Sequence, residues 1–161
     1  MKILFLHGKE SGPHGRKYQA IVDAGHQVVS PDLVGVELEG RVRIAQSILD
    51  REVFDVVVGS SLGGATAVKA IQRRQVGALV LCAPAVGYLD GTYTFPSNTL
   101  VIQGIQDTVV THQSVLAFCL AWNLRLVSVN DDHRLGNSRE HILAFIREQD
   151  ERGGGESGKA G

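Results

Sequence analysis

A strand, a tight corner and a helix follow one another between Phe54 and Ala70, and this stretch constrains the fold more than any other. The run Val56-Val57-Val58 is apolar and β-branched, as in a strand that is buried on both faces. From Leu62 onward, apolar residues recur along one side of a helix. Between them, Gly59-Ser60-Ser61-Leu62-Gly63 matches the pattern G-x-S-x-G, with Ser61 at its centre. Such a corner lifts one hydroxyl above the sheet edge, and the flanking glycines remove side chains that would clash there.

Short apolar runs alternate with helical segments along the chain, which predicts an α/β fold with a parallel sheet and helices on both faces. Strands are expected at 2–6, 27–30, 56–58, 77–83, 99–103 and 124–129, and helices at 16–24, 39–52, from 62 onward, 112–122 and 138–150. Residues 84–98 are expected to form an irregular loop or a weak helical turn. We expect one domain over residues 1–150 and a disordered tail over residues 151–161, because the tail has no apolar residue able to pack.

Composition narrows the class of protein. The chain has 161 residues, of which 43% are hydrophobic and 20% charged, as in an ordinary globular domain. Its formal net charge of −1 gives no reason to expect nucleic acid or a membrane surface as a partner. No apolar run approaches the roughly 20 residues that span a bilayer, and the N-terminal run is too short for a signal peptide. Cys82 and Cys119 stand among apolar residues without metal-ligand spacing, so we expect packed thiols, no metal and a cytoplasmic location.

A serine hydroxyl is a weak nucleophile and needs a base, which in turn needs an orienting acid. In an open α/β sheet, functional groups gather beyond the carboxyl ends of the strands. Asp107 follows the fifth expected strand, and His133 follows the sixth. The order Ser61, Asp107, His133 is the order in which this chemistry occurs on sheets with a G-x-S-x-G corner. The sequence therefore predicts Ser61 as nucleophile, His133 as base and Asp107 as acid.

Each of these three residues could instead have a structural role without catalysis. The corner alone also fits a glycine-rich turn with a capping serine, Asp107 could cap the helix near Thr111, and His133 could be an exposed loop residue. Other residues at the same edge keep further alternatives open: Asp131 or Asp132 as acid, His112 as base, and His14 as part of the pocket wall.

A serine hydrolase also needs two N–H donors aimed at the developing oxyanion. The backbone N–H of Leu62 is one candidate, because it directly follows the serine at a helix N-terminus. The backbone N–H of Lys9 is the other, because Gly8 lets the chain turn sharply after the first strand. We expect His7 to hold this loop rather than to act as a base.

Four segments together resemble the α/β-hydrolases: Leu6-His7-Gly8, Gly59-Ser60-Ser61-Leu62-Gly63-Gly64, residues 101–110 and Asp132-His133. Chain length and the His-Gly opening are similar to small, lidless bacterial esterases of the YqiA/YcfP-like group. This resemblance implies a minimal α/β-hydrolase fold with about six parallel strands and no substantial cap domain. It also implies the same roles for Ser61, Asp107, His133, Lys9 and Leu62, with no cofactor. The chain has no room for the first two strands of the full family fold, and the usual cap insertion shrinks to about residues 84–98.

The resemblance implies hydrolysis of carboxylic esters through an acyl-enzyme on Ser61. With so short a cap segment, we expect an open, shallow, mainly apolar cleft that favours small-molecule esters with short acyl chains or small activated esters. The same three residues would also serve a thioesterase, an amidase or a carbon–carbon hydrolase, because pocket shape decides among these. A binding module that keeps the fold without catalysis is the remaining alternative.

Overall fold

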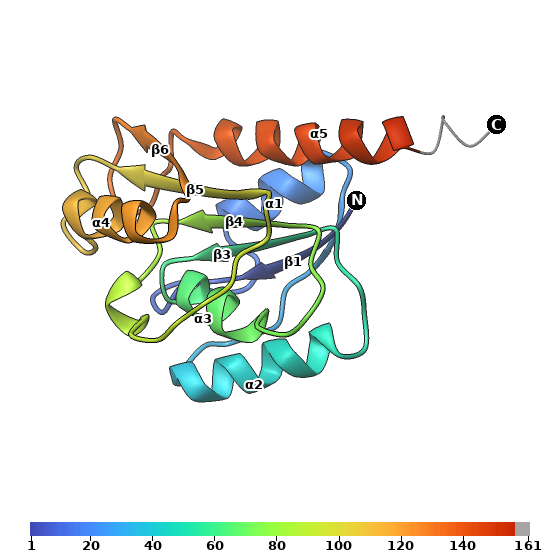
Figure 1. The fold of residues 1–161 in the computed structure, drawn as a ribbon, viewed down its shortest axis with the longest axis horizontal. Coiled ribbons are helices and arrows are strands. Elements are labelled where there is room, and N and C mark those ends of the chain that lie inside the picture. The colour runs from blue at the N-terminus through green and yellow to red at the C-terminus, as the bar shows by residue number, and fades with distance from the viewer. Residues whose placement is uncertain (157–161) are drawn as a thin grey trace.

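Six parallel strands form a single sheet in the computed structural model, which describes residues 1–156 (Figure 1). The strands are β1 (Lys2–Leu6), β2 (Gln27–Val29), β3 (Val56–Ser60), β4 (Ala78–Cys82), β5 (Thr99–Gly104) and β6 (Arg125–Val129). Their order in the sheet is β2-β1-β3-β4-β5-β6. The chain therefore goes outward from β1 to β2 and then returns past β1 to β3. Such a reversal of strand order leaves a crevice beyond the carboxyl ends of the two adjacent strands, where ligands of open α/β sheets bind.

Helices cover both faces of this sheet, as predicted. One apolar cluster joins the sheet to α2 (Leu38–Leu49), α3 (Leu62–Ala70) and α4 (His112–Trp122). The other joins it to α1 (Arg16–Asp23) and α5 (Arg139–Glu156), which lie together on the opposite face (Figure 1). Alternation along the strands supplies both clusters: in β1, Leu4 and Leu6 face one side, whereas Ile3 and Phe5 face the other.

The α3 helix is buried almost all round, which departs from the one-sided pattern expected for it. Eight of its residues are buried, and the helix packs against both β3 and α2. Small side chains make this burial possible, since Gly63, Gly64, Ala65 and Ala67 leave room for neighbouring backbone. The corner that carries Ser61 is therefore fixed by the core on each side of it.

The C-terminal boundary predicted from the sequence is wrong. The α5 helix continues past Asp150 to Glu156, so residues 151–156 are helical rather than part of a disordered tail. One contact ties the extension to the rest of the fold: Arg152 donates from Nη1 to Asn98 Oδ1 at 2.8 Å. Residues 157–161 of the predicted tail lie outside the described residues.

Between β4 and β5 the chain forms no cap domain. This connection contains one short 3₁₀ helix, η1 (Val86–Tyr88), within the segment expected to be irregular. Among residues 1–156, no helix combines the length and the apolar character that crossing a membrane requires. Cys82 and Cys119 are free, buried and on opposite faces of the sheet, which confirms the prediction of packed thiols.

Candidate active site

Ser61 occupies the tight corner between β3 and α3, with φ of 54° and ψ of −116°. A positive φ is uncommon for a residue with a side chain and is seen where surrounding structure holds a functional group in place. The corner is clamped from β4: Ser61 N donates to Cys82 O at 2.9 Å, and Ala85 N donates to Ser61 O at 3.0 Å. Glycine is required at Gly63 because a Cβ there would overlap the Leu6 carbonyl oxygen and lie 2.7 Å from His7 O. The sequence thus folds into a corner that presents the Ser61 hydroxyl outward.

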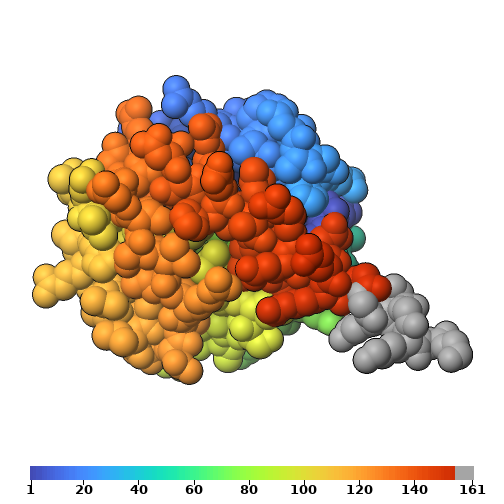
Figure 2. Space-filling model, turned by 90° about the horizontal axis from the view of Figure 1, so that it is seen from above, coloured from blue at the N-terminus to red at the C-terminus, as the bar shows by residue number. Residues whose placement is uncertain are grey.

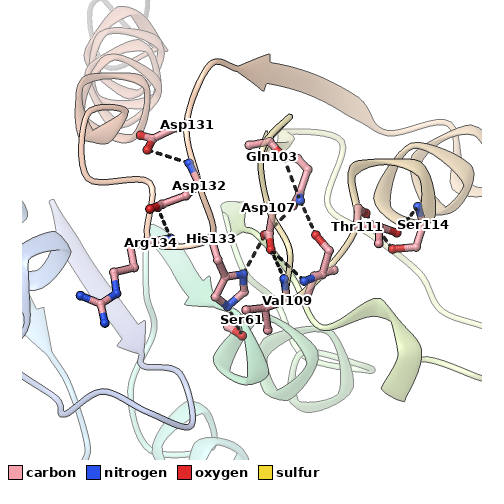
Figure 3. A network of polar contacts seen from close by, with 12 residues as sticks. Ser61, Gln103, Asp107, Val109, Thr111, Ser114, Asp131, Asp132, His133 and Arg134 are labelled. Atoms are coloured by element: carbon pink, nitrogen blue, oxygen red, sulfur yellow. Dashed lines mark hydrogen bonds and ion pairs between the residues drawn. The ribbon is translucent and has the colours of Figure 1, made fainter.

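The structure brings Ser61, His133 and Asp107 together in one hydrogen-bonded relay (Figure 3). His133 Nε2 lies 3.0 Å from Ser61 Oγ, and His133 Nδ1 lies 2.7 Å from Asp107 Oδ2. A carboxylate can only accept, so Nδ1 carries the proton in this contact and leaves Nε2 free to accept from the serine hydroxyl. The three residues follow the ends of β3, β5 and β6, as the sequence order predicted.

Four donors surround the Asp107 carboxylate, whose side chain has no solvent exposure. Val109 N and Val110 N each donate to Oδ1 at 2.8 Å. Gln103 Nε2 donates to Oδ2 at 3.1 Å, beside His133 Nδ1 on the same oxygen. Buried carboxylates need such partners, and here the bonds also fix the plane of the group toward the imidazole.

Gln103, fully buried at the end of β5, is a member of the site that was not predicted from the sequence. Its amide nitrogen also donates to Val110 O at 2.8 Å, so it ties the acid loop to the strand. Its Oε1 is buried and has no partner among the described residues. A lone amide at the end of an apolar strand run was the available signal.

The alternative acids turn away from the imidazole. Asp131 Oδ2 accepts from Ser138 Oγ at 2.8 Å and from Asn137 N at 2.9 Å, which fastens the His133 loop to the beginning of α5. Asp132 Oδ1 accepts from Arg134 N at 2.9 Å. Figure 3 shows both carboxylates bonded to backbone N–H groups of the loop that carries His133: Asp131 accepts from Asp132 N, and Asp132 accepts from Arg134 N.

The alternative histidines are also engaged elsewhere. His112 Nε2 lies 2.7 Å from Ser128 Oγ on β6, and the His14 ring packs on Tyr18 with centroids 4.6 Å apart. His7 is buried and bridges two loops: its Nε2 accepts from Leu33 N at 2.8 Å, and its Nδ1 lies 2.7 Å from Gly8 O. Burial lowers the pKa of His7, so the ring is neutral at neutral pH. His7 thus holds the loop after β1.

Two backbone N–H groups next to Ser61 have no acceptor in the described part of the chain: those of Lys9 and Leu62. Both residues line the same cavity of about 50 Å³. The loop after β1 also lies against the serine, because a Cβ built on Gly8 would be 3.4 Å from Ser61 Cβ. The predicted donors therefore border one small space beside the nucleophilic corner.

Three further segments complete the wall of this small cavity. Besides Lys9 and Leu62, it is lined by the β2–α2 connection, the first turns of α2 and η1: Gly35, Val36, Glu37, Leu38, Arg41 and Tyr88. Arg41 is buried at the wall and was not predicted from the sequence. Its signal was a charge at a position of α2 that shares a face with buried Ala45.

A larger cavity of about 500 Å³ lies away from Ser61, near the beginnings of β5 and β6 and the second half of α5. Figure 2 shows this hollow between residues 122–125 (orange), which lead into β6, and α5 (red). Residues 95–99, which lead into β5, also line it. Ser61, Asp107 and His133 line neither cavity, but the smaller cavity reaches the serine corner through Leu62, which directly follows Ser61. Within residues 1–156, no group of three or more His, Cys, Asp or Glu side chains could hold a metal ion.

Sheet topology and the serine corner together define the α/β-hydrolase fold, here without a cap domain. Solved structures share it. A candidate hydrolase of the alpha/beta superfamily from Xanthomonas campestris pv. campestris is 24% identical, with a TM-score of 0.77 over 93% of this chain and 97% of that chain. A serine hydrolase without a lid from Xanthomonas campestris is 18% identical, with a TM-score of 0.68 over 94% and 81%.

Est1E from Butyrivibrio proteoclasticus, in a structure with ferulic acid bound, is 17% identical, with a TM-score of 0.76 over 92% of this chain and 88% of that chain. No protein-family model matches the chain, and no curated protein matches it. The likeness to the solved structures establishes the fold.

Proposed function

We propose that this protein is a serine hydrolase that cleaves small carboxylic esters through an acyl-enzyme on Ser61. The observation that carries the proposal is the relay Ser61–His133–Asp107, with contacts of 3.0 and 2.7 Å, beside two unpartnered N–H donors. Isolated serine corners and isolated Asp–His pairs are common. Their convergence at one sheet edge, next to a small cavity, is typical of acyl transfer.

Acylation begins when Ser61 Oγ attacks the ester carbonyl carbon and His133 Nε2 takes the hydroxyl proton. The carbonyl oxygen becomes an oxyanion, which the N–H groups of Lys9 and Leu62 stabilise at the positive end of α3. Asp107 stabilises the imidazolium that forms. His133 then gives its proton to the leaving alkoxide, so that the C–O ester bond breaks and an alcohol departs. The acyl group stays on Ser61.

Deacylation repeats the same steps with water as nucleophile. His133 Nε2 removes a proton from water as its oxygen attacks the acyl carbon. The second tetrahedral intermediate collapses, the proton returns to Ser61 Oγ, and the carboxylic acid leaves.

Cavity size supports a small acyl group. About 50 Å³ beside the N–H donors is far below the roughly 300–1,000 Å³ of pockets that enclose drug-sized ligands. Val36, Leu38 and Leu62 supply its apolar lining, beside the polar residues Lys9, Glu37 and Arg41, and this apolar part suits a methyl or ethyl group. A long alkyl chain would have to lie on the open surface.

The test compares p-nitrophenyl acetate, butyrate and palmitate with wild-type protein and Ser61→Ala. We expect faster turnover of the two short esters than of the palmitate, and a loss of at least about 10³-fold in kcat for Ser61→Ala. Retained activity in a folded Ser61→Ala protein would contradict the proposal. Faster palmitate turnover would contradict its acyl-size part.

A further inference from the structure

A buried cation without a carboxylate partner lies beneath the loop that carries Lys9. Arg41 on α2 is 1% exposed, and no ion pair involves it in the described part of the chain. Its guanidinium instead donates to main-chain oxygens of two loops: Nη1 to His7 O at 2.7 Å, Nη2 to Leu33 O at 3.0 Å and Gly8 O at 3.3 Å, and Nε to Val36 O at 2.9 Å. Burial lowers the pKa of Arg41. Keeping an unpaired charge buried is costly, so these carbonyl contacts must compensate for lost hydration.

The Gly8–Lys9 peptide links this cation to the candidate site. Gly8 O accepts from His7 Nδ1 at 2.7 Å and from Arg41 Nη2 at 3.3 Å, with Ser11 Oγ at 3.5 Å from the same oxygen. The peptide is trans, since the described chain contains no cis bond. In a trans peptide the C=O and the N–H point in opposite directions. Holding Gly8 O inward therefore turns the N–H of Lys9 outward, toward the cavity that it shares with Leu62.

Glycine makes this anchoring necessary. Gly8 lacks a side chain, so one of the two rotations that turn the Gly8–Lys9 peptide, the rotation about ψ of Gly8, meets little steric restriction. A flipped peptide would present the Gly8 carbonyl oxygen to the developing oxyanion and repel it. We infer that Arg41 is a positioning residue: together with His7, its guanidinium keeps this peptide in the orientation that makes Lys9 N–H an oxyanion donor. This inference rests on the proposed function.

Replacing Arg41 should weaken binding of the transition state and not of the substrate. The oxyanion exists only after Ser61 attacks, so losing one donor lowers kcat and leaves KM nearly unchanged. Loss of one oxyanion donor lowers kcat by about 10²–10³-fold in serine hydrolases. If Arg41 only stabilised the fold, replacing it would reduce the stability and the amount of active protein without changing kcat per active site.

The experiment measures kcat and KM for p-nitrophenyl acetate in Arg41→Met, normalised to the sites titrated by a fluorophosphonate. Arg43→Met is the matched control, because Arg43 is exposed on the same helix. We expect Arg41→Met to lose about 10²–10³-fold in kcat with KM within threefold, and Arg43→Met to match the wild type. A folded Arg41→Met protein with kcat within threefold of the wild type, or with the loss confined to KM, overturns the inference.

Arg41→Lys keeps the test decisive if Arg41→Met fails to fold. Lysine retains the charge but offers one donor group in place of the planar fork, so it cannot bond all four carbonyls at once. Its kcat should fall at least tenfold, and an unchanged kcat overturns the inference. If kcat is unchanged in Arg41→Lys while Ser61→Ala abolishes turnover, the inference about Arg41 fails and the proposed function stands. If the wild-type protein has no turnover, the proposed function itself fails.

Discussion

Replacing Asp107 with asparagine tests the relay through a single atom exchange. The amide must place its oxygen where Oδ1 accepts from Val109 N and Val110 N, because neither backbone donor can rotate. Its NH₂ group then occupies the Oδ2 position, where it meets the protons of His133 Nδ1 and Gln103 Nε2. Gln103 can turn its unpartnered Oε1 toward the new donor. His133 can avoid the clash only by moving its proton from Nδ1 to Nε2.

That change of tautomer sets the magnitude. With a proton on Nε2, the imidazole can no longer accept the proton of Ser61 Oγ, although the distances stay the same. The equivalent exchange in a Ser-His-Asp triad lowers kcat by about 10⁴-fold, or about 5.4 kcal/mol of transition-state stabilisation. The free energy of unfolding should fall by only about 1.5–3 kcal/mol, the range for a hydrogen bond to a charged group.

The assay is kcat for p-nitrophenyl acetate in Asp107→Asn and in Asp132→Asn, with unfolding in urea as a check on folding. Asp132 is exposed and bonds only within its own loop, so its variant should stay within a few-fold of the wild type. A folded Asp107→Asn protein within tenfold of wild-type kcat would refute the reasoning. So would an equal loss in Asp132→Asn.

Three further predictions concern the core and its titratable groups. Gly63→Ala should lower the free energy of unfolding, measured in urea, by about 1–3 kcal/mol or more, because the methyl group would overlap the Leu6 carbonyl oxygen and lie 2.7 Å from His7 O. Gly12→Ala, with no atom within 4 Å, should be nearly neutral, and equal losses would contradict this. Because burial lowers the pKa of His7 below its usual 6.5, the unfolded chain takes up this proton first as pH falls. Stability that His7 contributes above about pH 6.5 is then lost at lower pH, so the urea midpoint should fall more from pH 7.5 to 5.5 in the wild type than in His7→Gln; equal slopes would count against it. Burial raises the pKa of Cys82 and of Cys119 to about 11, so a disulfide reagent at pH 8 should label both thiols in urea and neither in the native protein, and rapid native labelling would contradict the structure.

Much of the fold follows from local signals in the sequence. Valine and leucine runs mark the strands, and the alternation with helices predicts the parallel sheet that the structure contains. Helix α4 has the predicted bounds, because Thr111 caps its beginning and Asn123 ends it in a left-handed conformation. The end of the last helix has no such local signal: its extension to Glu156 contacts Asn98, far away in sequence, through Arg152.

The candidate site divides in the same way. Ser61, Asp107 and His133 can be found because each follows an apolar strand run and their order suits one chemistry. Gln103 and Arg41 could not be predicted in this way, because their partners come together only in the folded protein. Arg41 bonds to main-chain oxygens of distant loops, and Gln103 bonds to the Asp107 carboxylate. A buried amide or guanidinium has no characteristic spacing. Its only local sign is a polar residue in an apolar pattern.

Covalent labelling of the native protein with a fluorophosphonate tests the central claim most directly, since such reagents react with activated serines. We expect one adduct per chain, located on Ser61 by mass spectrometry of the digested protein, and none in Ser61→Ala or in protein unfolded with urea. Absence of an adduct on the native chain, or an adduct at another residue that persists in Ser61→Ala, would contradict it.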